Sequence, residues 1–268
     1  MRYKDVLSLI KEGGADVKIL AEEIFNVPYE KFLLYGEKEA EEDKIESLKK
    51  GIELLKEDVP VQYIIGKWTF SEREFKVGKG VLIPREDTLS AVNLAKRYLN
   101  ENSIFADLGS GSAVIAVTLS KDCGCKGYAI EKSKEAFCYL ESNVKALGAD
   151  VKCINSDMFS PSLLESLPTL DLVVSNPPYI TGSEMKALEN KVLKEPHEAL
   201  FGGEDGLDFY REISKKYYPK LKKGGALVFE VGYTQADAVL KILENEGYHT
   251  PQEEKDINGI RRAVCAIK

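Results

Sequence analysis

The chain lacks a long apolar run, a cluster of cysteine and histidine, and an excess of positive charge. No stretch of 18 apolar residues occurs among its 268 residues, so we expect no helix that spans a membrane. The five cysteines include no C-x-x-C pair and form no cluster with histidine, which predicts that the protein binds no metal. The formal net charge of −7 argues against a protein that binds nucleic acid through a broadly basic surface, and leaves open only a local basic patch.

The composition indicates a folded protein of the cytoplasm. Hydrophobic residues make up 44% of the chain, which is enough for a sizeable core. An odd number of scattered cysteines is typical of reduced, mostly buried thiols. The first residues, MRYKDVLSLIKEGG, carry a charge every few positions, a pattern of neither a signal peptide nor a membrane anchor. We therefore expect a cytoplasmic location and no membrane partner.

Hydrophobic periodicity divides the chain into three parts. Residues 1–58 contain three stretches with apolar side chains at helical spacing, which predict a small helical bundle. Residues 59–84 include VQYIIGKWTF and REFKVGKGVLIP, which are rich in β-branched and aromatic residues and predict a connecting β-hairpin. Residues 85–268 alternate between short apolar runs and amphipathic stretches. That alternation predicts an α/β domain with a mostly parallel sheet, covered by helices on both faces and closed by a terminal antiparallel hairpin.

A glycine-rich loop, DLGSGSAVIA (107–116), follows the first predicted strand of this domain and opens a helix. Gly109 and Gly111 allow the backbone to turn sharply and to approach a ligand closely. In an open α/β sheet, ligands bind beyond the carboxyl ends of the strands, which is where this loop lies. The loop reads G-x-G-x-A, without the third glycine of a dinucleotide fingerprint and without a Walker lysine, so neither a pyrophosphate cradle nor a P-loop fits.

Acidic residues end the next two predicted strands. Glu131 follows Gly109 by 22 positions, where a carboxylate can accept hydrogen bonds from both hydroxyls of a ribose. Asp157 can accept from an adenine amino group, and Met158 can pack on the ring. With the glycine loop, these residues match the adenosyl pocket of class I methyltransferases, which use S-adenosylmethionine. The alternative, an ordinary strand-to-helix turn with acids at strand ends, stays open.

The fourth predicted strand, LDLVVSN (170–176), ends in the corner N-P-P-Y. Pro177 and Pro178 have a fixed φ and no N–H group, and each proline holds the preceding residue extended. The carbonyl of Pro177 and the side-chain carbonyl of Asn176 therefore form two acceptors with no neighbouring donor to occupy them. An –NH2 group held by both oxygens would be oriented for methyl transfer, and Tyr179 would form a wall beside its planar group. The corner predicts methylation of a planar –NH2 group.

With both motifs in place, the chain resembles the HemK/PrmC family, the protein-(glutamine-N5) methyltransferases that modify peptide chain release factors. Three departures stand out: Ala113 where glycine is usual, Glu131 where aspartate is usual, and Glu86-Asp87 for proline and glutamate. The matching segments cover nearly the whole chain and are PVQYIIG (60–66), VLIPREDT (81–88), DLGSGSAVIA, an identical NPPYI, EPHEALFGGEDGLDFYREI (195–213), LVFEVGYTQ (227–235) and DINGIRRAV (256–264).

The resemblance implies a Rossmann-like sheet of seven strands with the last strand antiparallel, and a helical domain that helps to hold the release factor. The substrate would be the glutamine of a Gly-Gly-Gln loop, and S-adenosylhomocysteine would be the second product, with no metal involved. Asn176, Pro177 and Tyr179 would grip the glutamine amide, with Pro178 in the same corner, and Asn176 would also approach the cofactor. The implied cofactor contacts are Gly109, Ser110, Gly111, Ser112, Ala113, Glu131, Asp157 and Met158.

Two other functions stay open at this point. A methyltransferase acting on the amino groups of adenine, cytosine or guanine could use the same corner, although the net charge of −7 and the lack of an added base-reading domain disfavour it, and we expect no direct nucleic-acid binding. A continuous basic trench leading to Tyr179 would revive that alternative. A non-catalytic adenosyl-binding module is the other possibility, and the intact N-P-P-Y corner argues against it.

Overall fold

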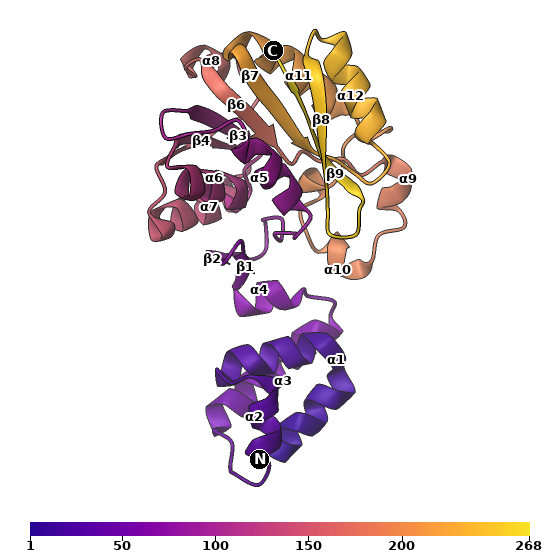
Figure 1. The fold of residues 1–268 in the computed structure, drawn as a ribbon. Coiled ribbons are helices and arrows are strands. Elements are labelled where there is room, and N and C mark those ends of the chain that lie inside the picture. The colour runs from indigo at the N-terminus through magenta and orange to yellow at the C-terminus, as the bar shows by residue number, and fades with distance from the viewer. The chain divides into compact units, whose positions relative to one another are not determined.

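The computed structural model describes residues 1–268, which form two compact units (Figure 1). One unit comprises Met1–Trp68 and Glu189–Lys194, and the other comprises Thr69–Leu188 and Glu195–Lys268. The division falls later in the chain than residue 58, where the periodicity suggests a boundary. None of the helices combines the length and the apolar character needed to cross a bilayer.

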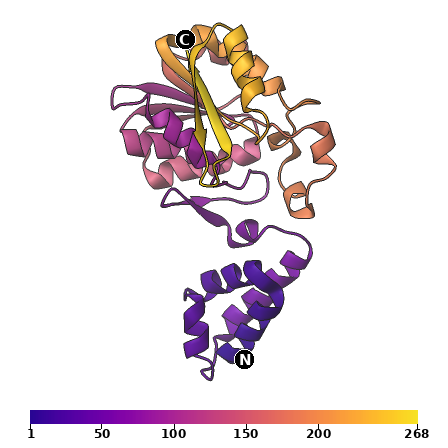
Figure 2. The same cartoon turned by 45° about the vertical axis from the view of Figure 1, so that its right-hand side comes forward.

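The first unit is helical (Figure 2). Its core contains a cluster of aromatic rings, in which Tyr3, Phe25 and Phe32 lie with centroids 5.5–5.7 Å apart. Gly14 interrupts α1 with a φ of 73°. The helices of this unit are α1 (Tyr3–Phe25), α2 (Tyr29–Leu34), α3 (Glu42–Lys56), α4 (Val61–Ile65) and, from a distant part of the chain, α10 (Asn190–Leu193).

The predicted hairpin is shorter than expected, and the strand prediction for residues 61–65 is wrong. These residues form α4, which begins after Pro60 and ends at Gly66 with a φ of 81°. A proline at the start and a left-handed glycine at the end are helix boundary signals, and here they outweigh the β-branched composition. The hairpin itself consists of β1 (Lys67–Phe70) and β2 (Arg73–Lys76), joined by a two-residue turn with positive φ at both positions.

The second unit contains the predicted seven-stranded sheet, with the order β5-β4-β3-β6-β7-β9-β8. Neighbouring strands from β5 to β7 pair in parallel, whereas β9, the last strand of the chain, is antiparallel to β7 and β8. The prediction of an antiparallel last strand is therefore confirmed. The strands are β3 (Ile104–Leu108), β4 (Lys126–Glu131), β5 (Val151–Asn155), β6 (Leu170–Ser175), β7 (Leu221–Glu230), β8 (His249–Lys255) and β9 (Arg261–Ile267).

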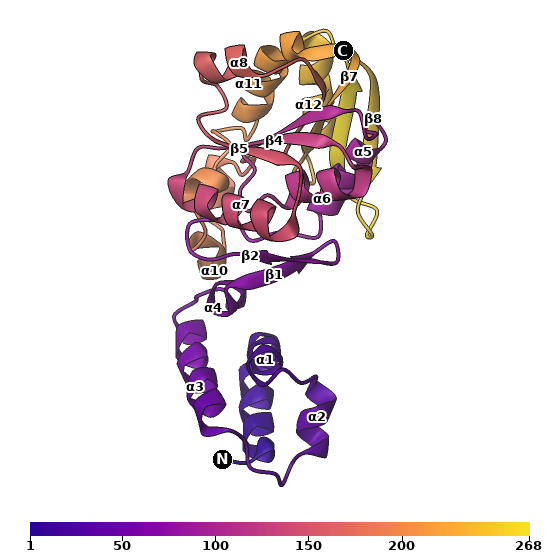
Figure 3. The same ribbon diagram turned by 90° about the vertical axis from the view of Figure 1, so that its left-hand side faces the viewer.

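Helices cover both faces of the sheet (Figure 3). Successive residues of β6 point to opposite cores: Leu172 and Val174 lie in one and Val173 in the other. One face packs on α5 (Thr88–Lys96), α6 (Val114–Cys123) and α7 (Lys134–Leu147). The other face packs on α8 (Pro161–Ser166), α11 (Asp208–Tyr217) and α12 (Ala236–Asn245). The remaining short helices of this unit are α9 (Gly182–Met185) and the 3₁₀ turns η1 (His197–Ala199) and η2 (Tyr218–Lys220).

The strand order determines where a ligand can bind. From β3 the chain moves outward to β4 and β5, and then returns to the other side of β3 with β6. Loops that leave β3 and β6 in opposite directions open a crevice at their carboxyl ends. The glycine loop follows β3 and the N-P-P-Y corner follows β6, and these strands are hydrogen-bonded neighbours with Leu108 opposite Ser175. The two sequence motifs therefore meet at this crevice.

Candidate functional site

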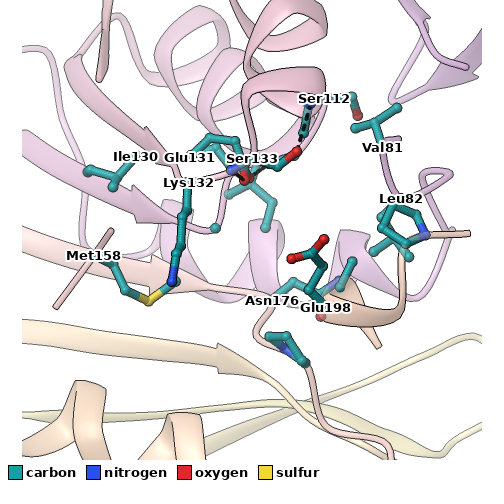
Figure 4. Close-up of a pocket in the computed structure, with 18 of the residues that line it drawn as sticks. Val81, Leu82, Ser112, Ile130, Glu131, Lys132, Ser133, Met158, Asn176 and Glu198 are labelled. Atoms are coloured by element: carbon teal, nitrogen blue, oxygen red, sulfur yellow. Dashed lines mark hydrogen bonds between the residues drawn. The ribbon is translucent and has the colours of Figure 1, made fainter. Parts of the chain in front are cut away.

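A cavity of 590 Å³ lies at the carboxyl edge of the sheet, wholly within the second unit. Its volume lies within the usual range for small-molecule sites, about 300–1,000 Å³. Figure 4 shows side chains that surround it, and the lining residues come mainly from the glycine loop, the ends of β4, β5 and β6, and two further segments. Those segments are residues 80–88, which precede and open α5, and residues 196–199, which include η1.

The glycine loop has the backbone geometry that the sequence predicts. Gly109 and Gly111 have φ values of 70° and 53°, in the left-handed region that favours glycine. The N–H groups of Gly109 and Ser110 both donate to the carbonyl of Ile130, so β4 holds the loop in place. Ala113 caps α6 with a φ of 68° and is fully buried. A methyl group at a left-handed position costs about 1 kcal/mol, so the alanine adds local strain where a glycine would add none.

Glu131 is fixed at the edge of the cavity by two backbone donors. Its Oε2 accepts from the N–H of Gly111 at 2.9 Å, and its Oε1 accepts from the N–H of Ser133 at 2.8 Å. Burial raises the pKa of this carboxyl, and the backbone hydrogen bonds partly offset that effect. Each oxygen keeps a second lone pair, so the carboxylate is held rigid and can still accept from a ligand hydroxyl.

Asp157 and Met158 lie on the same side of the cavity as Glu131, after β5. Asp157 accepts from the N–H of Phe159 at 2.9 Å and from Lys132 Nζ at 2.9 Å. Although burial opposes it, these hydrogen bonds hold the pKa of Asp157 below its usual value. Met158 lines the cavity with the rings of Phe159 and Phe209, whose centroids are 6.0 Å apart. An apolar wall beside a fixed carboxylate suits a flat, heterocyclic ligand.

The N-P-P-Y corner lies across the crevice from the glycine loop. Asn176 and Pro178 line the cavity, whereas Pro177 is buried behind them and Tyr179 and Ala113 do not line it. None of the hydrogen bonds in the loops ends on the carbonyl of Pro177. Burial, with a contribution from the nearby Glu230, raises the pKa of Tyr179, so its phenol stays protonated. The cavity thus collects nine of the twelve residues predicted as the site.

The corner is held from behind by the segment after β7. Gln235 Nε2 donates to the carbonyl of Tyr179 at 2.9 Å and to that of Gly206 at 3.3 Å, while its Oε1 accepts from the N–H of Gly232. Gly202 packs so closely that a Cβ there would lie 2.5 Å from the carbonyl oxygen of Pro178. These contacts leave the corner little freedom to move.

An ion pair ties together the two segments that form the outer wall of the cavity. Glu195 is buried, accepts from the backbone N–H of Ile83 at 2.9 Å and pairs with Arg85. Lys132, which lines the cavity, pairs with Asp157, and Arg262 pairs with the carboxylates of residues 87 and 256.

Two carboxyl groups are fully buried below the site. Asp107 lies under the glycine loop, where Oδ2 accepts from the N–H of Ala116 at 3.1 Å and Oδ1 has no partner. Glu230 ends β7 below the corner, and its Oε2 likewise has no partner. Burial raises the pKa of each to about 7. Each group is therefore close to its titration point at neutral pH.

Sequence reasoning missed Glu195, Glu230, Gln235 and Phe209 as parts of the site. Glu195 and Gln235 bind partners that are 112 and 56 positions away in the sequence, and Glu230 is distinguished only by its burial. No local sequence pattern indicates such contacts. The family resemblance covers the segments that contain these residues but assigns no role to any of the four.

Comparisons with known proteins agree with both units. Residues 5–66 match the family model of the PrmC N-terminal domain, and residues 70–227 match the methyltransferase small domain. A release factor glutamine methyltransferase of Bacillus subtilis (strain 168) is 39% identical over 239 residues, which cover 84% of this chain and 81% of that protein. Another, of Clostridium acetobutylicum, is 34% identical and aligns over 100% of this chain and 99% of its own.

Solved structures with the same architecture are more distant in sequence. The hMettl16 catalytic domain in complex with the MAT2A 3′UTR hairpin 1 is 15% identical, with a TM-score of 0.58 over 85% of this chain and 81% of its own. A methyltransferase from Pyrococcus furiosus is 19% identical and has a TM-score of 0.50. The match covers 66% of this chain and 80% of that one. Likeness at this level shows the fold alone, which is that of the class I S-adenosylmethionine-dependent methyltransferases.

We expect the buried Asp107 to make stability fall as pH rises. Its pKa is raised from 3.8 to about 7, so the folded state keeps its proton longer than the unfolded state does. The unfolding free energy therefore decreases as pH rises from 3.8, and the decrease ends above pH 7. Between pH 5 and pH 8, the stability of Asp107→Asn relative to wild type should rise by about 3 kcal/mol. Urea denaturation at both pH values measures this, and a difference that does not change with pH contradicts the assignment.

Proposed function

The chain belongs to the release factor glutamine methyltransferase family, and we propose that it transfers a methyl group from S-adenosylmethionine to the side-chain amide nitrogen of a glutamine in a peptide chain release factor. The glutamine of a Gly-Gly-Gln loop is the proposed target. The observation that carries the proposal is the position of Asn176, which lies at the end of β6, lines the cavity and is followed by two residues without an N–H group.

The proposed chemistry depends on holding an amide nitrogen. An amide is a weak nucleophile because its lone pair is delocalised into the carbonyl. If Asn176 Oδ1 and the carbonyl oxygen of Pro177 each accept one N–H of the substrate amide, the nitrogen is oriented and its electron density is increased. As the bond from nitrogen to the methyl carbon forms, the bond from that carbon to sulfur would break, and its electron pair would remain on the neutral sulfur of S-adenosylhomocysteine. The nitrogen gains positive charge and then loses one hydrogen to water as a proton. The two fixed oxygens stabilise that charge without reorganisation.

The second part of the proposal concerns the cofactor. S-adenosylmethionine supplies an electrophilic methyl group on a positively charged sulfur. Glu131 would accept from its ribose, Met158 would pack on its adenine, and Asp157 would accept from the adenine amino group. The glycine loop, from Gly109 to Ala113, would surround the rest. In support, the cavity has the size of a small-molecule site, and left-handed glycines leave the backbone uncovered at the crevice.

The first unit is proposed to hold the release factor. It matches a domain model named after the same family, and its helices include no residue of the cavity. We propose a cytoplasmic location, where release factors act. The alternative of methylation on nucleic-acid bases is not favoured, because the relatives that align with most of the chain carry the release factor name and the cations near the cavity are paired with carboxylates.

One experiment tests the proposed function. The purified protein is incubated with S-adenosylmethionine and a purified bacterial release factor, and the Gly-Gly-Gln peptide is examined by mass spectrometry. We expect one added methyl group on the glutamine, and none on a release factor in which that glutamine is replaced by glutamate. Transfer to RNA or DNA and not to the release factor would favour the alternative.

Replacing Asn176 should separate chemistry from cofactor binding. In Asn176→Ala one of the two proposed acceptors is lost, and loss of one such hydrogen bond typically lowers kcat about 10²–10³-fold. The dissociation constant for S-adenosylhomocysteine should change much less. Steady-state kinetics and calorimetry measure the two quantities, and near-normal kcat in the variant would refute the proposed role.

Replacing Glu131 should have the opposite effect. Glu131→Ala removes the proposed ribose acceptor and also the acceptor of the hydrogen bond from the N–H of Gly111. The dissociation constant for S-adenosylmethionine should therefore rise at least about tenfold. Glu131→Gln keeps an acceptor oxygen and serves as the matched control, with a smaller loss. The ribose assignment is wrong if calorimetry gives the alanine variant an unchanged affinity.

A further inference from the structure

We propose that Glu198 is a specificity-determining residue that faces the positively charged sulfur of the cofactor and favours S-adenosylmethionine over the neutral product S-adenosylhomocysteine. The inference rests on the proposed cofactor, but not on the identity of the substrate that is methylated.

Glu198 belongs to the cavity wall, in the short turn η1. Figure 4 shows its carboxylate directed into the cavity. The side chain is exposed to solvent and forms no ion pair within the chain, so its charge is free to act on a ligand. The residue therefore offers a carboxylate to whatever occupies this part of the cavity.

Backbone contacts on both sides fix the position of this turn. On one side, the buried Glu195 accepts from the N–H of Ile83 at 2.9 Å. On the other side, the N–H of Ile180, the residue after the N-P-P-Y corner, donates to the carbonyl of Leu200 at 2.9 Å. Glu198 precedes that hydrogen bond by only two residues, so it is anchored next to the corner.

The cavity carries more negative than positive charge. The two cations that line it are each paired with a carboxylate, Lys132 with Asp157 and Arg85 with Glu195. Glu131 and Glu198 have no cationic partner, and the oxygens of Glu131 accept from backbone N–H groups. Burial raises the pKa of Glu131, and the charge of Glu198 adds to that rise, as expected for two carboxylates that face one space. A positively charged ligand would relieve this excess of negative charge.

The covalent structure of the cofactor determines where its positive charge would lie. The sulfur is bonded to the 5′ carbon of the ribose, for which Glu131 is the proposed partner, and to the methyl group that is transferred at Asn176. The sulfur would therefore lie between these two residues. Glu198 interacts with Glu131 and is anchored next to the corner that contains Asn176, so its carboxylate faces the same region.

Charge is what distinguishes the cofactor from the product at this position. S-adenosylmethionine has a sulfonium group, whereas S-adenosylhomocysteine has a neutral thioether and shares every other charged group. An unpaired carboxylate attracts the sulfonium, and the attraction is stronger in a protein cavity than in open water. The product should therefore bind less tightly than the cofactor, which favours its exchange for new cofactor after transfer.

The test compares the dissociation constants of three ligands by calorimetry. S-adenosylmethionine and sinefungin both carry a positive charge at this position, in sinefungin as an ammonium group in place of the sulfonium methyl, and S-adenosylhomocysteine carries none. Glu198→Gln keeps the shape of the side chain and removes its charge. Glu165→Gln is the matched control, because Glu165 is an exposed acid of α8 in the same unit and does not line the cavity. Thermal unfolding checks that both variants are folded.

In Glu198→Gln, the dissociation constants for S-adenosylmethionine and sinefungin should rise at least about threefold, as for the loss of a partly solvated ion pair, and that for S-adenosylhomocysteine should stay within about twofold. Glu165→Gln should keep the wild-type preference. Added salt should weaken the preference for S-adenosylmethionine in the wild type more than in Glu198→Gln, because counterions screen the charge.

Equal weakening of all three ligands in Glu198→Gln, or weakening of none, overturns the inference. Wild-type protein that binds the cofactor but transfers no methyl group to release factors overturns the proposed substrate and leaves this inference standing. Wild-type protein that binds none of the three ligands overturns both.

Discussion

Two prolines after Asn176 remove two N–H groups from the end of a buried strand, and the chemistry of the site depends on that removal. A strand end normally offers donors as well as acceptors, and a donor beside the substrate amide would compete with it. Because the two prolines that follow Asn176 have only acceptor groups, the crevice can hold an –NH2 group by both hydrogens. The sheet order then brings this corner opposite the glycine loop of the neighbouring strand β3.

A corner of this kind works only if it is rigid, and most of the surrounding contacts serve that end. Gln235 holds the carbonyl of Tyr179, and Gly202 lets a second backbone segment pack against Pro178. Buried acids below the site reduce stability above their raised pKa values, which is the expected cost of keeping polar groups where they orient others. The structure thus gives up some stability for a fixed set of acceptors.

Much of this could be predicted from the sequence because the signals are local. The hydrophobic periodicity predicted the sheet and its helices. Two glycines predicted the turn after β3, and the two prolines predicted the corner after β6. The helix at 61–65 was missed because five residues carry little periodicity and β-branched composition suggested a strand. The assignment of residues 189–194 to the helical unit, and the contacts of Glu195, Gln235 and Glu230, depend on tertiary packing between distant segments. No single-sequence pattern encodes such contacts.

The central claim is that two fixed oxygens hold the glutamine amide, and a crystal structure with S-adenosylhomocysteine and a Gly-Gly-Gln peptide tests it most directly. We expect the amide nitrogen of the glutamine to lie within hydrogen-bond distance, about 3 Å, of both Asn176 Oδ1 and the carbonyl oxygen of Pro177. Asn176 Nδ2 should still face Thr88, as it does in the free protein. A glutamine side chain bound away from the corner, or an asparagine that presents its –NH2 group to the substrate, would show that the two oxygens do not hold the amide.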